Sequence, residues 1–122
     1  MSWAHGEHNN RLCDELYENG RYPDWVLTTA FYAALHYVEH LLFKGPVPLT
    51  PYRSIRAAQD HYRAAKHEAR QYLLDDHQPE IADKYRYLHQ MSHNARYIDY
   101  QVSGDAVRLC RLYLNDIREF CM

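Results

Sequence analysis

Apolar residues recur every three to four positions along almost the whole chain, whereas alternation at every second position is nearly absent. This spacing predicts amphipathic helices, because residues three and four apart lie on the same face of a helix. The expected helices span about 8–18, 23–43, 53–74, 79–97 and 103–120. The sequence therefore predicts an all-α protein, folded as an up-and-down bundle of four to five helices in a single domain, 1–122.

Residues with special backbone preferences mark the ends of these segments. Gly20 follows the first segment and suits the left-handed conformation that commonly closes a helix. Pro23 suits a first helical turn, and Ser103 or Asp105 suits an N-cap. Three of the five prolines fall within 44–51, which predicts a loop between the second and third helices.

The segment 23–43 carries aromatic residues on two faces. One apolar arc includes Phe31, and a second, narrow stripe includes Trp25, Tyr32 and His36. A helix that is apolar on both faces is usually central to a domain or lies at a subunit interface. We therefore expect this helix to be the spine of the domain.

Composition narrows the possible functions. The chain has 122 residues, of which 47% are apolar and 25% charged, an ordinary globular balance. The formal net charge of −2 provides no global positive field, so any surface that binds nucleic acid must be a local patch. Cys13, Cys110 and Cys121 form no CxxC pair, as is usual in a reducing compartment. With no leader and no membrane-spanning run apparent, we expect a cytoplasmic protein that does not enter a membrane.

Basic and potentially basic residues gather on one side of the expected helix 53–74. They are Arg56, Arg63, Lys66, His67 and Arg70. The three arginines are spaced by seven residues, so they stack along one face. Such a stripe can hold phosphates through charge-assisted hydrogen bonds. The alternative is a solvated face whose charge is balanced by Asp60, Glu68 and Asp75.

A second candidate site lies on the helix expected to begin at Pro79. Arg86 and His93 are also seven residues apart, and Tyr97 joins the same strip. At the border of the core, the pKa of an imidazole can be tuned and a guanidinium can bind phosphate. The alternative is a boundary strip whose polar ends remain in water.

Metal and cofactor motifs are absent from the sequence. His36 and His40 are spaced so that they can share a metal ion, but no third ligand accompanies them at a recognisable spacing. The chain also has no HExxH motif, no glycine-rich phosphate loop and no nucleophile elbow. We therefore expect no metal and no cofactor, and a histidine at position 36 that is hydrogen-bonded to a neighbour.

Two segments carry a family resemblance. The sequence DWVLTTAFYAALHY at 24–37 looks like the second helix of HEPN domains, named for higher eukaryotes and prokaryotes nucleotide-binding. The segment 85–97, which ends in Ala95, Arg96 and Tyr97, is similar to the RY segment of that family. The resemblance extends over roughly 5–120 and implies a bundle of four to five helices that is commonly dimeric.

Many HEPN members are metal-independent ribonucleases, often toxins or defence effectors, in which four to six residues separate an arginine from a following histidine. Here that pattern fits Arg56 with His61, Arg70 with His77, and Arg86 with His93. The last pair is preferred because its two side chains share a helix face. Other members lack this chemistry and bind nucleotides or act as interaction modules.

Three functional hypotheses follow from the resemblance. A homodimeric endoribonuclease uses His93 as general base and Arg86 to stabilise the phosphate, while the basic stripe holds RNA. A non-catalytic module binds a nucleotide or RNA through Arg96, Tyr97 and His36. Such a module is paired with a nucleotidyltransferase or an antitoxin in a toxin–antitoxin or defence system. A structural dimerisation module uses none of these residues.

Overall fold

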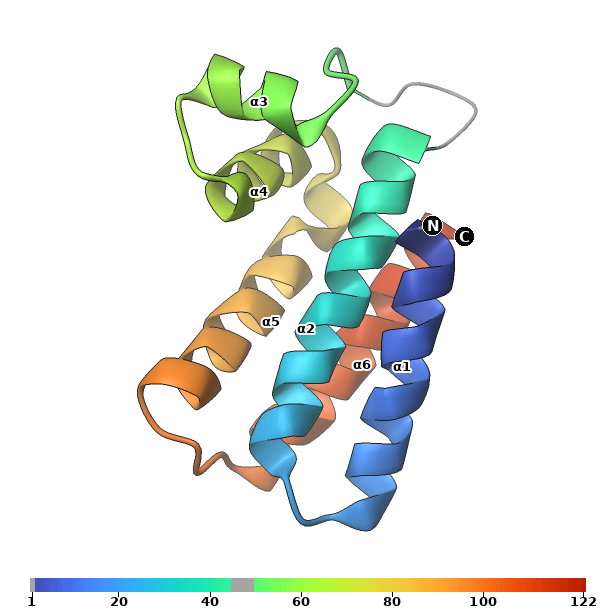
Figure 1. The fold of residues 1–122 in the computed structure, drawn as a ribbon, viewed down its shortest axis with the longest axis vertical. Coiled ribbons are helices and arrows are strands. Elements are labelled where there is room, and N and C mark those ends of the chain that lie inside the picture. The colour runs from blue at the N-terminus through green and yellow to red at the C-terminus, as the bar shows by residue number, and fades with distance from the viewer. Residues whose placement is uncertain (1, 45–49) are drawn as a thin grey trace.

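The computed structural model describes residues 2–44 and 50–122, and within these ranges the chain folds into helices joined by short turns (Figure 1). The elements are α1 (Ser2–Asn19), α2 (Pro23–Glu39), the π-helix η1 (His40–Lys44), α3 (Ile55–Tyr62), α4 (Lys66–His77), α5 (Pro79–Tyr97) and α6 (Gly104–Cys121). The prediction of an all-α protein is confirmed for the described residues.

Helix α2 is the centre of the bundle. It packs against α1, α5 and α6, and Figure 1 shows these four long helices side by side, with α3 and α4 across one end. The largest fully buried side chains include Tyr37, Tyr85 and Phe31, two of which belong to α2. The expectation that 23–43 forms the spine of the domain is therefore confirmed.

Several helix ends follow the local signals in the sequence. Gly20 adopts a positive φ of 74° directly after α1, and Pro23 and Pro79 are the first residues of α2 and α5. The Ser103 side chain accepts a hydrogen bond of 3.1 Å from the backbone N–H of Ala106, which makes it the N-cap of α6. The termini of these helices are thus encoded locally.

Gly6 allows α1 to lie close against α2. A Cβ atom placed on this residue would lie 2.7 Å from Cε1 of Tyr37, well inside van der Waals contact. The Tyr37 ring is fully buried, and its hydroxyl donates to Oε1 of Glu7 at 2.7 Å and accepts from Asn10 at 3.1 Å. Because these contacts fix the ring, any side chain at position 6 would force the two helices apart.

The single helix predicted over 53–74 is wrong, because the segment forms two helices, α3 and α4. Arg63 lies between them with a φ of 53°, in the left-handed region that ends a helix. The turn folds α3 back on α4, so that the Tyr62 hydroxyl donates to Asp76 at 2.6 Å. The described residues therefore contain six α-helices instead of four or five, and no single face carries the predicted basic stripe.

Two other boundaries differ from the prediction. Helix α1 begins at Ser2 and not near position 8, and the last turn of the second predicted helix is the π-helical η1. Part of the loop predicted at 44–51, namely 45–49, lies outside the described residues.

Candidate functional site

Side chains from three helices meet on the face between α2, α4 and α5, in a group that we call the Arg96 cluster. Its members are Phe31, Tyr32, His67, His89, Arg96 and Tyr97. His89 stacks on Phe31, with ring centroids 4.8 Å apart and planes inclined by 9°. The ring of His67 lies 4.8 Å from that of His89. Aromatic and imidazole rings thus form a continuous layer beside the arginine.

The Arg96 guanidinium lies among three aromatic rings. Its Cζ atom is 5.3 Å from the ring centroid of Tyr32, 5.4 Å from that of Tyr97 and 5.9 Å from that of Phe31. At these distances the rings attract the cation electrostatically. Its Nε and Nη1 atoms are buried, and neither has a hydrogen-bond partner among the described residues. Arg96 therefore holds a positive charge and two unused donors inside an aromatic environment.

Next to this cluster, the buried Arg70 forms an ion pair with the partly buried Glu39. Arg70 is only 3% exposed, and its Nε and Nη2 atoms donate to Oε1 of Glu39 at 3.0 and 2.5 Å. Its Nη1 atom lies 3.2 Å from Nδ1 of His67. Because arginine can only donate, Nδ1 is the acceptor and the imidazole proton is on Nε2. Arg70 was predicted to bind phosphate, but its guanidinium is engaged inside the fold.

Burial keeps both histidines of the cluster uncharged at neutral pH. Burial, assisted by the neighbouring His67 and Arg96, lowers the pKa of His89 from its ordinary 6.5 to about 4. Burial, followed by the charge of Arg70, also lowers the pKa of His67. Since the charges of Arg70 and Glu39 cancel, the net positive charge of this region comes from Arg96.

The depressed pKa of His89 predicts that the fold loses stability in mild acid. Between pH 6.5 and about 4 the unfolded chain binds a proton at this histidine and the folded chain does not, so the free energy of unfolding falls as the pH falls. Thermal unfolding measured from pH 7.5 to 4.5 should show this decline, and His89→Gln should reduce it. Equal pH dependence in the two proteins would contradict the assignment.

Arg86, the predicted catalytic cation, is held in ion pairs. Its guanidinium donates to both carboxylate oxygens of Asp75, at 2.7 and 2.8 Å, and to Asp83 at 2.8 Å. His93, its predicted partner, is exposed, and its ring lies 4.9 Å from that of Tyr97. Two carboxylates neutralise Arg86, whereas His93 adjoins the Arg96 cluster.

The remaining predicted residues fall into two groups. Arg56, Arg63 and Lys66 are exposed on α3, on the turn and at the start of α4, and none contributes to the Arg96 cluster. His36 faces the groove between α1 and α2, where its ring stacks on His5 with centroids 3.8 Å apart. The structure therefore brings His67, Arg96, Tyr97 and His93 together, places His36 nearby, and leaves the exposed cations apart.

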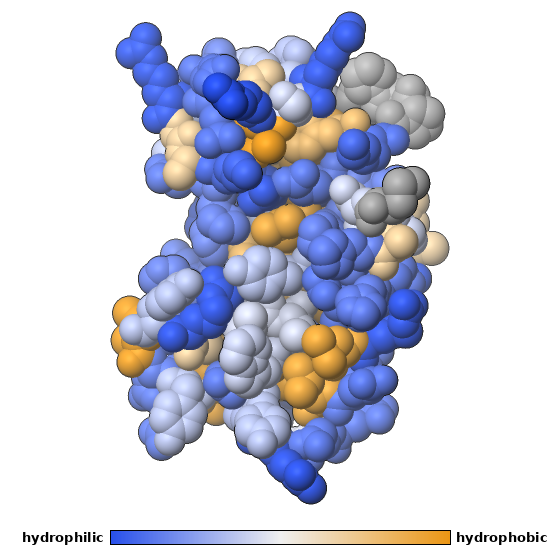
Figure 2. Space-filling view, viewed as in Figure 1, coloured by the Kyte–Doolittle hydropathy of each residue, from blue (hydrophilic) through white to orange (hydrophobic). Residues whose placement is uncertain are grey.

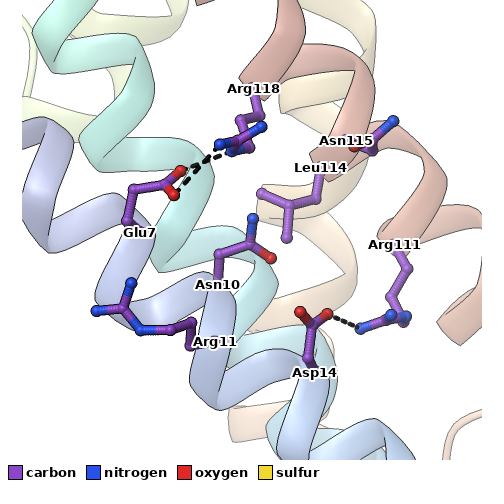
Figure 3. Close-up of a pocket in the computed structure, with 8 residues that line it drawn as sticks. All are labelled: Glu7, Asn10, Arg11, Asp14, Arg111, Leu114, Asn115 and Arg118. Atoms are coloured by element: carbon purple, nitrogen blue, oxygen red, sulfur yellow. Dashed lines mark hydrogen bonds and ion pairs between the residues drawn. The ribbon is translucent and has the colours of Figure 1, made fainter.

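A polar cavity of about 410 Å³ lies between α1 and α6 (Figure 3). Ion pairs cross it: Arg118 donates to Glu7 at 2.6 Å, and Arg111 donates to Asp14 at 2.9 Å. The hydrogen bond from Arg118 and that from Tyr37 lower the pKa of the Glu7 carboxyl, so the carboxylate is charged at neutral pH. The bridging cations of this cavity are thus matched by carboxylates, and their ion pairs connect α1 to α6 across it.

Sequence reasoning missed His89 and Glu39. His89 precedes Arg96 by seven residues, which places both side chains on the same face of α5, so periodicity alone could have included it. Glu39 lies 31 residues before its partner Arg70, and no local pattern connects the two.

Comparison with protein-family models, with curated proteins and with solved structures finds no match to this chain. The likeness to HEPN domains therefore stays a resemblance of the two segments described above. Among residues 2–44 and 50–122, no helix has the length and apolar character needed to cross a membrane. Over the same ranges, no three His, Cys, Asp or Glu side chains gather as metal ligands.

Proposed function

We propose that this chain is a nucleotide- or RNA-binding module in which Arg96 contacts a phosphate. The observation that carries the proposal is the guanidinium itself, which has two buried donor nitrogens without partners and no matching carboxylate among the described residues. A buried donor left unsatisfied costs roughly 1–3 kcal/mol, and more when it is charged. An anionic ligand that accepts these hydrogen bonds removes that cost.

The surroundings of Arg96 favour a nucleotide over a simple anion. Tyr97 is 71% exposed, so its ring can move aside for a phosphate and then stack on the attached sugar or base. Tyr32 presents a second ring next to the same guanidinium. A cation flanked by aromatic rings is the combination that proteins use for single-stranded nucleic acid and free nucleotides.

The test compares Arg96→Gln with Arg86→Gln, two substitutions of the same kind on the same helix. Binding of a fluorescent single-stranded RNA, and thermal shifts with adenosine phosphates, are measured with EDTA present. We expect Arg96→Gln to weaken binding by about 10–100-fold, because a charged hydrogen bond contributes roughly 1.5–3 kcal/mol. The wild-type affinity should also fall with rising salt.

Arg86→Gln is the matched control, since its guanidinium is already satisfied by Asp75 and Asp83. It should bind within about twofold of the wild type once folded. Unchanged binding in Arg96→Gln, or a loss confined to Arg86→Gln, would refute the proposal.

Metal-independent cleavage of RNA is a second candidate, favoured by the position of His93. This exposed imidazole lies beside Tyr97 and three residues from Arg96, within reach of a ribose bound to the same guanidinium. A general base next to an unpaired cation can cleave RNA through its 2′-hydroxyl without a metal. The test is incubation of labelled RNA in EDTA. If the wild type cleaves the RNA and His93→Ala does not, the protein is a nuclease. If the wild type leaves the RNA intact, the binding module is the function that stands.

Assembly forms a separate part of the proposal. The homodimer and the nucleotidyltransferase or antitoxin partner remain predictions from the resemblance to HEPN domains. The exposed side chains of Ile98 and Tyr100 beside α5 give a dimer an apolar surface to bury. Sedimentation of the purified chain measures whether a dimer forms, and Ile98→Asp should weaken it.

A further inference from the structure

An aromatic groove of about 510 Å³ runs along α1 and α2, on the face shown in Figure 2. Its lining includes Asn9, Leu12, Leu16, Trp25, Tyr32 and His36. Figure 2 shows pale side chains of intermediate hydropathy over α2 and the lower end of α5, beside orange apolar side chains over α1. Trp25 is 52% exposed in this groove, a large exposed fraction for a tryptophan.

Tyr32 joins this groove to the Arg96 cluster. Its ring lines the groove and also lies 5.3 Å from Cζ of Arg96. A molecule whose phosphate contacts Arg96 therefore has the groove directly beside it. This continuity determines the kind of group that the groove accepts, because that group must be covalently attached to an anion.

The groove has the chemistry of a nucleobase site. Trp25 and Tyr32 offer flat faces for stacking, and leucines from α1 supply an apolar wall. The amide of Asn9 provides one donor and one acceptor, the pair that asparagine presents to an adenine edge. His36 is stacked on His5, and its pKa is lowered by burial and by the charge of His5, so it adds an uncharged polar edge.

From this arrangement we infer that the groove between α1 and α2 holds the base of a nucleotide whose phosphate is bound by Arg96. The inference rests on the proposed function, since it needs the phosphate at Arg96. The ligand class is a nucleoside phosphate with a purine base, either free or as one residue of single-stranded RNA. Both sources present the same base and phosphate.

The test compares three probes: adenosine 5′-monophosphate, ribose 5-phosphate, which has the phosphate without the base, and a five-residue oligoadenylate. We expect the wild type to bind adenosine monophosphate at least about fivefold more tightly than ribose 5-phosphate, because each stacked base contributes measurably to affinity. Tighter binding of the oligomer identifies RNA as the source, and tighter binding of the monomer identifies a free nucleotide.

Trp25→Leu should bring the ratio of the two dissociation constants close to one. Tyr72→Leu is the matched control, because Tyr72 is an exposed aromatic residue on α4, away from the groove, and this variant should keep the wild-type ratio. The chain has two tryptophans, so the variant Trp3→Phe leaves Trp25 as the fluorescent reporter. Adenosine monophosphate should quench this reporter and ribose 5-phosphate should not.

The outcomes separate the base site from the phosphate site. A wild-type ratio near one, with binding that still depends on Arg96, would overturn the base site and leave the proposed function standing. A ratio that survives in Trp25→Leu would likewise place the base elsewhere. If the wild type binds none of the three probes, both proposals fail.

Discussion

Glu39→Leu is expected to lower the free energy of unfolding by about 3 kcal/mol, because it leaves the Arg70 guanidinium buried without its carboxylate. Arg70 is almost completely buried, and its Nε and Nη2 atoms both donate to Glu39. Without Glu39, the guanidinium loses its hydration on folding and gains no ion pair that offsets this cost. In thermal unfolding, a chain of 122 residues should then melt roughly 10 °C lower.

The double variant Glu39→Leu/Arg70→Met separates the ion pair from simple packing. Replacing both charges with apolar side chains of similar size removes the uncompensated cation, so most of the lost stability should return. Urea unfolding of the wild type, both single variants and the double variant gives the coupling energy. Losses that merely add in the double variant would show that packing, and not the charge pair, determines the stability of this region.

The helix ends were predictable wherever a single residue decides the local backbone. Gly20, Pro23 and Ser103 act within one turn of their own positions, by a positive φ, a fixed φ and a side-chain cap. The apolar period of α2 likewise predicted its central place, since a helix with two apolar faces must be covered on both sides. These features depend on neighbours in sequence, so the sequence contains them.

The break between α3 and α4 depends on tertiary contacts and has no local signal. Arg63 adopts the left-handed conformation although no glycine or proline near it in the sequence indicates a helix end. The turn is accompanied by contacts that exist only after folding, among them the hydrogen bond from Tyr62 to Asp76 and the burial of Ala58. Seven-residue spacing therefore predicted a basic stripe on a helix that does not continue.

The candidate site likewise contains residues that the sequence identifies and a contact between helices that it does not. Arg96 and Tyr97 were identified through the family resemblance, and in the structure the Arg96 guanidinium lies near the rings of both Tyr97 and Tyr32. The pairing of Arg86 with Asp75 joins two helices and decides whether that arginine is free, which helical periodicity does not reveal. Sequence patterns can suggest which cations belong to a site, but only the folded structure shows which of them are paired with a carboxylate.

The Phe31 ring connects the core to the candidate site, and its removal should affect both. Phe31 is fully buried and contacts His89, His67 and Tyr85. Phe31→Ala should lower the free energy of unfolding by about 3–5 kcal/mol, because it removes apolar contacts and leaves a cavity. Phe31→Leu refills most of that volume, so its free energy of unfolding should fall by only about 1 kcal/mol. This variant therefore stays folded and can be measured even if Phe31→Ala does not fold.

The same substitutions should change the protonation of the cluster. Burial is the largest cause of the low pKa of His89, and the Phe31 ring stacked on its imidazole provides part of that burial. Water admitted beside the imidazole stabilises its charged form, so the pKa of His89 should rise from about 4 toward its ordinary 6.5. An NMR titration of the imidazole in Phe31→Leu measures this shift. An unchanged pKa would mean that the positive charges of Arg96 and Arg70 keep His89 neutral, and that the aromatic layer affects stability alone.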